Sequence, residues 1–362
     1  MQKPLELSSN ETSHEDDCGV AVEELTHCPL CQSERIKPFA TSYDRLCLTS
    51  RQEFRYSRCA DCDLIFQSRR PMESEIHRFY PSEYGPYKPQ AGGGDGAVVA
   101  NSGLRRLVQN VARRIAQFAS RIEGKIWPNR FQQSYWQPYQ PQSAGQTLLD
   151  FGCGSDTFLN HARRRGWDTT GVDFSPQAVE SARGSGHKAY LLSDHLWESL
   201  PDQSFDLVRM SHVLEHLYDP LDILRRLASK MKPGGVIHIA LPNPQSLSAR
   251  LFGARWFSLD SPRHIMLFTP ARLRQLLVEA GFENVSVLHE PLTKDIARSL
   301  AYVLIERGWI KHAAIHQCIG NSLLDGLLSV PMRLAGLMLG GDRFHMYAHR
   351  QEIAEVRRSK AA

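Results

Sequence analysis

The sequence predicts an α/β fold: a doubly wound, mostly parallel sheet of seven strands, preceded by a small cysteine-rich module. Three observations carry this prediction. From residue 147 onward, β-forming segments alternate with amphipathic helical ones, which is typical of a parallel sheet covered on both faces. A pair of glycines follows the first of these segments, in "LLDFGCGSDTFL" at 148–159. Two C-x-x-C pairs lie in a β-rich stretch near the N-terminus.

The chain has 362 residues, enough for one large domain and a small one, or for two medium domains. Its net charge of +4 is small, so no nucleic-acid partner is expected. The chain does not begin with a basic region followed by an apolar core, and we therefore expect a cytoplasmic protein. The predicted divisions are a disordered tail at 1–24, a cysteine module at 25–70, a connector at 71–146, the α/β domain at 147–350 and a second tail at 351–362.

The cysteine module contains "CPLC" at 28–31 and "CADC" at 59–62. Because no secretion signal precedes these pairs, a metal site is favoured over a disulfide framework. Thiolates are soft ligands, and two such pairs on either side of a β-rich stretch suit a closed, tetrahedral zinc ribbon with a structural role. Free thiols are the alternative. The predicted zinc ligands are Cys28, Cys31, Cys59 and Cys62.

Two further segments have an amphipathic or apolar character. Residues 104–122 carry apolar side chains at helical spacing with arginines on the other faces, which predicts a helix. Residues 291–341 form an apolar insertion before the last strand, but its run at 323–339 is short and interrupted by charges, so no membrane span is predicted. Both segments are consistent with peripheral contact with a membrane surface. The alternative is that they pack on the α/β domain as a lid or a dimer face.

The remaining elements follow from periodicity and from capping signals. Ser175–Pro176 and Thr269–Pro270 each predict a helix start, with proline at the first helical position. In such a fold, ligands bind beyond the carboxyl ends of the parallel strands. The predicted strands are 147–151, 169–173, 188–192, 205–210, 235–241, 284–289 and 343–348, and the predicted helices are 156–165, 176–184, 220–231 and 270–280.

The glycine pair Gly152 and Gly154 predicts a tight turn at this ligand-binding edge. Glycine adopts positive φ angles and lets a ligand approach the backbone without a Cβ clash. The spacing is tighter than G-x-G-x-x-G, which argues against the usual dinucleotide fingerprint. Asp173 ends the second strand, where its carboxylate could accept both hydroxyls of a ribose.

Four segments in this order resemble the class I S-adenosylmethionine-dependent methyltransferases: "LLDFGCGSDTFL", "GVDFSPQAVESAR", "SFDLVRMSHVLEHLYDP" and "LASKMKPGGVIHIALPNP". The resemblance covers about 147–290 and 342–350, and it implies a Rossmann-like sheet whose last strand is antiparallel. It also implies that the glycine loop faces the methionine moiety, Asp173 the ribose and Asp194 the adenine. The cofactor-binding residues expected on this basis are Asp150, Gly152, Gly154, Asp173, Phe174, Asp194 and Ser211.

Asp156 departs from this family's pattern, which usually has glycine at that position. As an acid at the start of a helix it could stabilise the helix dipole by about 0.3–1 kcal/mol. It could also attract the α-amino group of the cofactor or repel its carboxylate. We expect that the cofactor still binds, with an adjusted affinity.

Two segments supply candidate catalytic residues. In "SHVLEHL", His212, Glu215 and His216 are spaced i, i+3, i+4 and would share a face of a helical turn, suiting proton abstraction, substrate positioning or metal binding. The segment resembles the metal-binding E-x-x-E-H pattern of ubiquinone-pathway O-methyltransferases, but with His212 in place of the first Glu. The alternative is that Glu215 and His216 tie the loop to neighbouring segments. His264, in "RWFSLDSPRHIMLFT", is the best candidate for a general base, and a buried structural histidine is the alternative.

The resemblance implies direct transfer of a methyl group to a small-molecule acceptor. A hydroxyl of a sugar-, phenol- or quinone-type compound is preferred, and a base is needed only for such an acceptor or for an acidic carbon. The cysteine module resembles zinc ribbons that precede some small-molecule methyltransferases, including sugar C-methyltransferases. Three alternatives stay open: a sugar C-methyltransferase, a ribosomal-RNA methyltransferase and a catalytically silent binding module.

Overall fold

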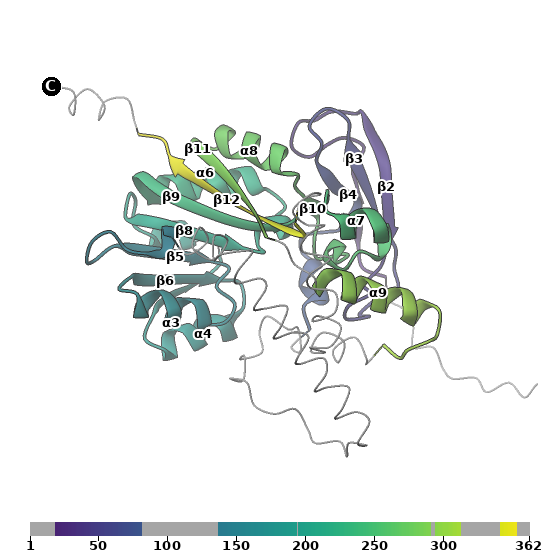
Figure 1. Ribbon diagram of the computed structural model, residues 1–362, viewed down its shortest axis with the longest axis horizontal. Helices are drawn as coiled ribbons and strands as arrows, with labels where there is room; N and C mark the ends of the chain where they lie inside the picture. Colours follow the sequence, from purple (N-terminus) through teal and green to yellow (C-terminus); the bar gives the residue numbers. More distant parts are fainter. Residues whose placement is uncertain (1–18, 82–136, 194, 291–293, 313–340, 353–362) are drawn as a thin grey trace, which may run out of the picture.

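The computed structural model describes residues 19–81, 137–193, 195–290, 294–312 and 341–352 (Figure 1). Two sheets lie side by side in both views, and the chain passes from the small N-terminal sheet to the large one and back. The predicted helix at 104–122, the apolar run at 323–339 and Asp194 lie outside the described residues.

The large sheet has seven strands in the order β11-β12-β9-β8-β5-β6-β7. The pairs β5–β6, β6–β7, β5–β8 and β8–β9 are parallel, whereas β12 runs antiparallel to both β9 and β11. The Rossmann-like sheet with an antiparallel last strand is therefore confirmed. The strands are β5 (Thr147–Phe151), β6 (Asp168–Asp173), β7 (Lys188–Leu191), β8 (Phe205–Ser211), β9 (Met231–Pro242), β11 (Phe282–Glu290) and β12 (Arg343–Arg350).

Helices cover both faces of this sheet because successive residues of each strand point to opposite sides. On β5, Leu149 packs in one core cluster with Leu224 of α6 and Leu276 of α8, whereas Leu148 packs in another with Ala162 of α3. The predicted caps are present: the hydroxyls of Ser175 and Thr269 accept backbone hydrogen bonds at the starts of α4 and α8. The helices are α3 (Thr157–Arg164), α4 (Pro176–Gly184), α5 (Leu196–Ser199), α6 (Pro220–Lys230) and α8 (Pro270–Glu279).

The N-terminal sheet contains four antiparallel strands in the order β1-β4-β3-β2. A fifth strand, β10 (Met266–Leu267), comes from the α/β part of the sequence and pairs with Phe66 and Ile65 of β4. We call these five strands the ribbon sheet (Figure 1). Its other strands are β1 (Val22–Glu24), β2 (Ile36–Ser42), β3 (Phe54–Cys59) and β4 (Ile65–Pro71), and a 3-10 helix, η1 (Ile76–Phe79), follows them.

The structure corrects one boundary of the predicted cysteine module and shows that the module packs into the main core. The expected tail at 1–24 ends too late, because Val22–Glu24 forms β1 and pairs with β4. The module is also not a separate unit: Cys28 and Phe66 belong to the same buried cluster as Leu276 of α8. A sheet of this size buries little apolar area by itself, so its inner face is covered by the α/β domain.

A set of short helices connects the two sheets. The segment after β9 forms α7 (Leu247–Phe252), η5 (Gly253–Arg255) and η6 (Phe257–Leu259). The described start of the 291–341 insertion is helix α9 (Lys294–Glu306), and its Tyr302 ring stacks on Phe257 with the centroids 5.8 Å apart. Within the described ranges, no helix has both the length and the apolar character needed to cross a membrane.

Candidate active site

The glycine loop leaves β5 at the edge where strand order reverses, between β6 and β8. Gly152 and Gly154 have φ angles of 79° and 55°. The amides of Gly152 and Cys153 donate to Val172 O at 2.7 and 3.0 Å, which turns the loop over the end of β6. A Cβ added to Gly152 would lie 2.3 Å from Cγ2 of Val213, so this position needs glycine both for its backbone and for its space.

Asp173 fastens this loop to the start of α4. Its Oδ2 accepts from Gly154 N at 2.8 Å and its Oδ1 from Ser175 N at 2.9 Å. Burial raises the pKa of the Asp173 carboxyl, and these backbone hydrogen bonds oppose the rise. Two carboxylate oxygens offer about four acceptor positions, so Asp173 retains capacity for ligand hydroxyls. The neighbouring Phe174 is 47% exposed, and its ring lies against Tyr80 at 5.2 Å.

Asp150, the last acid of β5 before the loop, is fully buried and pairs with Arg209 of β8 at 2.8 Å. Its second oxygen, Oδ2, makes no hydrogen bond to any part of the chain that the structure describes. Burial raises the pKa of Asp150, and the Arg209 guanidinium opposes that rise. A buried carboxylate oxygen without a donor, next to a loop that only glycine can form, fits a ligand with a cationic or N–H group such as S-adenosylmethionine.

The side chain of Asp156 is bound to two neighbouring residues. Its Oδ2 accepts from Asn160 Nδ2 at 2.9 Å and from the Ser185 hydroxyl. Asp156 occupies the N-cap position of α3, but its side chain accepts no capping hydrogen bond from the backbone. The carboxylate therefore ties the start of α3 to the residue that follows α4.

Beyond the end of β8, Glu215 is the centre of a group of histidines. His212 has a positive φ of 57°, and its Nδ1 lies 3.1 Å from Glu215 Oε1. Burial alone would raise the pKa of Glu215, but His212 and then the nearby His264 and His216 lower it to about 2. Glu215 is only 1% exposed, so the site contains a buried anion.

His216 and His264 meet on the other side of this anion. Their rings lie 4.7 Å apart at 76°, and His264 Nε2 is 3.8 Å from Glu215 Oε1. The His264 Nδ1–H donates to Ser258 O at 2.8 Å, which leaves Nε2 as the acceptor nitrogen. His216 Nδ1 lies 2.9 Å from both Arg263 O and the Tyr80 hydroxyl. Burial and then His264 lower the pKa of His216 to about 4.

The structure thus brings together all four candidate catalytic residues, although His264 is far from "SHVLEHL" in the sequence. His212 contacts Glu215, but not through the expected helical turn, because His212 has a positive φ and the short 3-10 helix η4 (Leu214–His216) begins after it. Ligand atoms of Glu215, His216 and His264 all lie within 4.8 Å of one another, so these three residues could also hold a metal ion.

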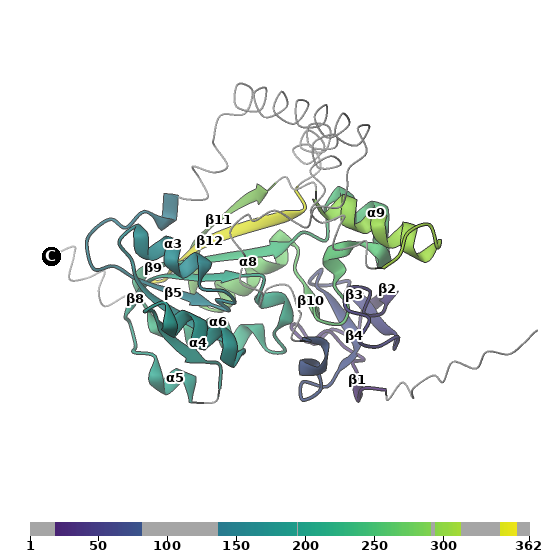
Figure 2. The same ribbon diagram turned by 90° about the horizontal axis from the view of Figure 1, so that it is seen from below.

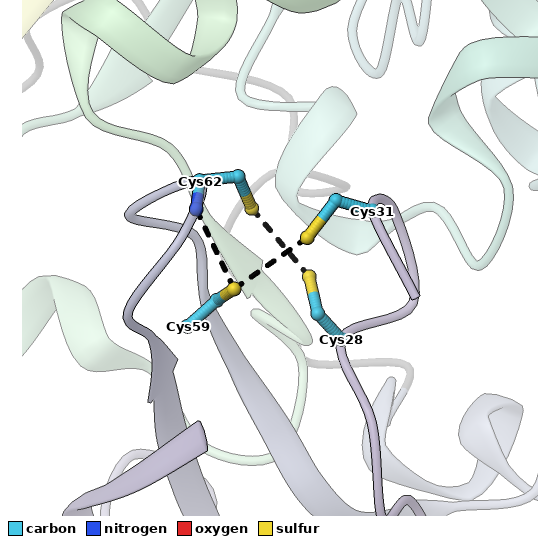
Figure 3. Close-up of side chains that lie close together, drawn as sticks. All are labelled: Cys28, Cys31, Cys59 and Cys62. Atoms are coloured by element: carbon cyan, nitrogen blue, oxygen red, sulfur yellow. Dashed lines mark hydrogen bonds between the residues drawn. The ribbon is translucent and has the colours of Figure 1, made fainter. Parts of the chain in front are cut away.

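The four predicted zinc ligands also converge. Figure 3 shows the side chains of Cys28, Cys31, Cys59 and Cys62 pointing toward one centre, with Sγ atoms 3.5 Å apart in the pairs Cys28–Cys62 and Cys31–Cys59. All four Sγ atoms lie within 4.8 Å of one another, as four thiolates around one tetrahedral ion require. Cys47 is not part of this group.

Sequence reasoning missed three residues at the site. Arg209 lies inside the quoted segment "SFDLVRMSHVLEHLYDP", but the resemblance gives it no role there, and Tyr80 lies in the connector. Gln67 of β4 contacts the backbone beside His264. Polar residues inside predicted buried strands are the signal that could have found Arg209 and Gln67, because buried polar groups are normally paired. No local signal marks Tyr80.

The chain is similar in sequence to known methyltransferases. A family model described as "Methyltransferase domain" matches residues 105–287. The chain is 29% identical over 168 residues to ubiquinone biosynthesis O-methyltransferase of Psychrobacter arcticus. The match covers 42% of this chain and 65% of that protein, so this chain spans less than two thirds of the relative's length. It is 33% identical over 165 residues to the protein of the same name from Xanthomonas axonopodis pv. citri, covering 41% of this chain and 69% of that one.

Among solved structures, a SAM-dependent methyltransferase from Archaeoglobus fulgidus is 22% identical to this chain, with a TM-score of 0.42. The match covers 62% of this chain and 98% of that one. The family match spans the glycine loop, Asp173 and the Glu215 cluster. The chain therefore belongs to the class I S-adenosylmethionine-dependent methyltransferase family.

Proposed function

We propose that the protein methylates a hydroxyl group of a small-molecule acceptor of the phenol, quinone or sugar type. The observation that carries this proposal is the buried cluster around Glu215, in which His264 presents an acceptor nitrogen beside an anion. A methyl acceptor that must lose a proton needs such a base. The two relatives named as ubiquinone biosynthesis O-methyltransferases favour an acceptor of the phenol or quinone type over a sugar.

S-adenosylmethionine, when bound, supplies a methyl group that is already activated for displacement. The chain's own residues would hold it through Asp150, Gly152, Gly154, Asp173, Phe174 and Ser211. Asp150 Oδ2 is the oxygen available for the cationic amino acid end, and Asp173 retains acceptor positions for the ribose. Asp194 stays a candidate for the adenine from its sequence position alone.

On the acceptor side, His264 Nε2 would take the hydroxyl proton while the Nδ1–H remains bound to Ser258 O. The Glu215 carboxylate, 3.8 Å from that nitrogen, would stabilise the imidazolium that forms. His212 and His216 would orient the carboxylate and the acceptor. The four cysteines would hold a structural zinc ion, because they form a closed site without an open position for a substrate.

Two measurements test this proposal. Isothermal titration with S-adenosylmethionine should show binding, and the absence of heat would support the catalytically silent alternative. Transfer of a tritiated methyl group should then be followed into 3,4-dihydroxybenzoate as a phenol probe, and into fractionated host metabolites, lipids and RNA. We expect label on a hydroxyl of a small molecule, and we expect His264→Asn to reduce the rate at least tenfold with unchanged cofactor binding. Label in RNA alone, or on carbon, would reject the proposal.

A further inference from the structure

Two buried side chains of the ribbon sheet bind the backbone of the segment that carries His264. Gln67 of β4 donates from Nε2 to Pro262 O at 2.9 Å and to His264 O at 3.0 Å. The Tyr56 hydroxyl of β3 lies 3.1 Å from the same His264 carbonyl and 3.3 Å from Leu259 O. Gln67 is 0% and Tyr56 1% exposed, so these donors serve the segment away from water.

The two side chains also contact each other, because Gln67 Nε2 lies 2.8 Å from the Tyr56 hydroxyl oxygen. The backbone continues the connection: Gln67 N donates to Ile265 O, and Ile265 N donates to Glu215 O, each at 2.9 Å. One hydrogen-bonded path therefore runs from the ribbon sheet through residue 265 to the backbone carbonyl of Glu215.

Arg263, which lies between Pro262 and His264, is also bound to the N-terminal part of the chain. Arg263 is fully buried, and its guanidinium pairs with Asp44, in the loop after β2, at 2.9 Å and with Asp260 at 2.6 Å. Its Nη1 donates to Phe79 O at 3.1 Å. Backbone and side-chain contacts thus hold residues 262–265 against the N-terminal part of the chain.

We propose that Gln67 and Tyr56 are positioning residues for His264, and that the ribbon sheet is thereby part of the acceptor side of the active site. Neither side chain touches the carboxylate of Glu215; both act through the carbonyl oxygen of His264. The proposal rests on the role of His264 as the base. A base displaced by about 1 Å can lose about 100-fold in rate, so a support of this kind matters for catalysis.

The test compares two glutamines of the N-terminal region. Gln67→Met removes the donors to the segment of His264. Gln52→Met is the matched control, because the Gln52 amide also binds backbone, but at Val20 instead of the segment of His264. Gln52 Oε1 accepts from Val20 N at 2.8 Å, and Gln52 Nε2 donates to Val20 O at 3.1 Å. The readout is the histidine side-chain nitrogen spectrum, measured by NMR on the full-length, zinc-loaded protein, with the His264 signals identified by their loss in His264→Asn.

We expect His264 in the wild type and in Gln52→Met to carry its proton on Nδ1. In Gln67→Met we expect a mixture of the two neutral forms of this one histidine, with cysteine-bound zinc and S-adenosylmethionine affinity unchanged. Unchanged His264 signals in a folded Gln67→Met protein would overturn the proposal. If that variant does not fold, Tyr56→Phe decides by the same criterion, because it removes one hydroxyl and keeps the ring.

Kinetics give a second readout that separates this proposal from the proposed function. With 3,4-dihydroxybenzoate and tritiated S-adenosylmethionine, kcat should fall at least tenfold in Gln67→Met, with the KM for S-adenosylmethionine within twofold of the wild type. The control Gln52→Met should keep both values. If His264→Asn leaves the rate unchanged while Gln67→Met still alters the His264 spectrum, His264 is not the base but the positioning contact is real.

Discussion

Arg209 and Asp150 form an ion pair across the two central strands of the sheet, with 2.8 Å between Nη1 and Oδ1. The carboxylate is fully buried and the arginine side chain is 14% exposed. The pair therefore joins β8 to β5 just before the glycine loop, and it leaves the other carboxylate oxygen without a hydrogen bond from any described residue.

Removing Arg209 should destabilise the protein strongly. In Arg209→Met, the buried Asp150 loses its compensating charge, and we expect a loss of about 3–5 kcal/mol in the free energy of unfolding. Urea denaturation at pH 8 measures it. The exposed pair Arg226–Asp222, with side chains 49% and 47% exposed, provides the control: Arg226→Met should cost less than about 1 kcal/mol. Equal losses in the two variants would contradict the burial argument.

Replacing Asp156 should change stability more than cofactor binding. Because its carboxylate is bound to Asn160 and Ser185, Asp156→Gly removes these hydrogen bonds and a helix-start acid, at a cost of about 1–2 kcal/mol. Titration with S-adenosylmethionine should give a dissociation constant within about threefold of the wild type, a difference of less than 1 kcal/mol. Asn160→Ala serves as the control, since it breaks one of the same hydrogen bonds outside the glycine loop. A tenfold or larger gain in affinity in Asp156→Gly alone would show that the acid opposes the cofactor.

Zinc removal should affect the whole molecule. The ribbon sheet shares a buried cluster with α6 and α8, so loss of the metal exposes a face of the main core. We expect one zinc ion per chain in the wild type and in the control Cys47→Ser, and none in Cys31→Ser. The Cys31→Ser protein should also unfold at a lower temperature than the wild type, in a single transition. Elemental analysis and calorimetry check this. Two separate transitions, with the upper one unchanged, would mean that the two sheets unfold independently.

The pH dependence of stability should include a contribution from Asp342. Burial and then the nearby Asp295 raise the pKa of its carboxyl from 3.8 to about 6. The folded state therefore binds this proton more tightly than the unfolded state does. Because this proton is lost as pH rises from about 4 to about 6, the free energy of unfolding of the protein falls over that range. Asp342→Asn, which stays neutral, should be more stable than the wild type by up to about 3 kcal/mol at pH 8, and this gain should disappear near pH 4.

Denaturation at both pH values measures the difference. Asp168→Asn is the control, because that carboxylate is 49% exposed in a surface pair with Lys188, and its replacement should change the free energy of unfolding by less than about 1 kcal/mol. An Asp342→Asn gain of the same size at both pH values would exclude titration of Asp342 as its cause.

Much of this architecture was predictable because its signals are local. The glycine loop, the end of β6 at Asp173 and the caps at Ser175 and Thr269 depend on residues within one strand-turn-helix unit. The four candidate zinc ligands can be recognised from their residue type and their C-x-x-C spacing. Each of these features needs only neighbours along the chain, and periodicity or motif spacing reports them directly.

The contacts that complete the site are long-range, and no local pattern reports them. The approach of His264 to Glu215 depends on where a loop after β9 folds back over the end of β8. The two-residue strand β10 is too short for a period-2 signal, and its partner β4 lies in what reads as another module. The partner of Asp156, Ser185, becomes visible only when α3 and α4 are packed side by side.

The pairing of β10 with β4 has a consequence for synthesis. The strands β1 to β4 leave the ribosome first, whereas β10 follows only after most of the large sheet has been translated. N-terminal units normally begin to fold during synthesis, but here the edge of β4 at Ile65 and Phe66 stays unpaired until late. An open strand edge invites pairing with other chains, so the nascent protein is most vulnerable to aggregation at the very strand that later supports His264.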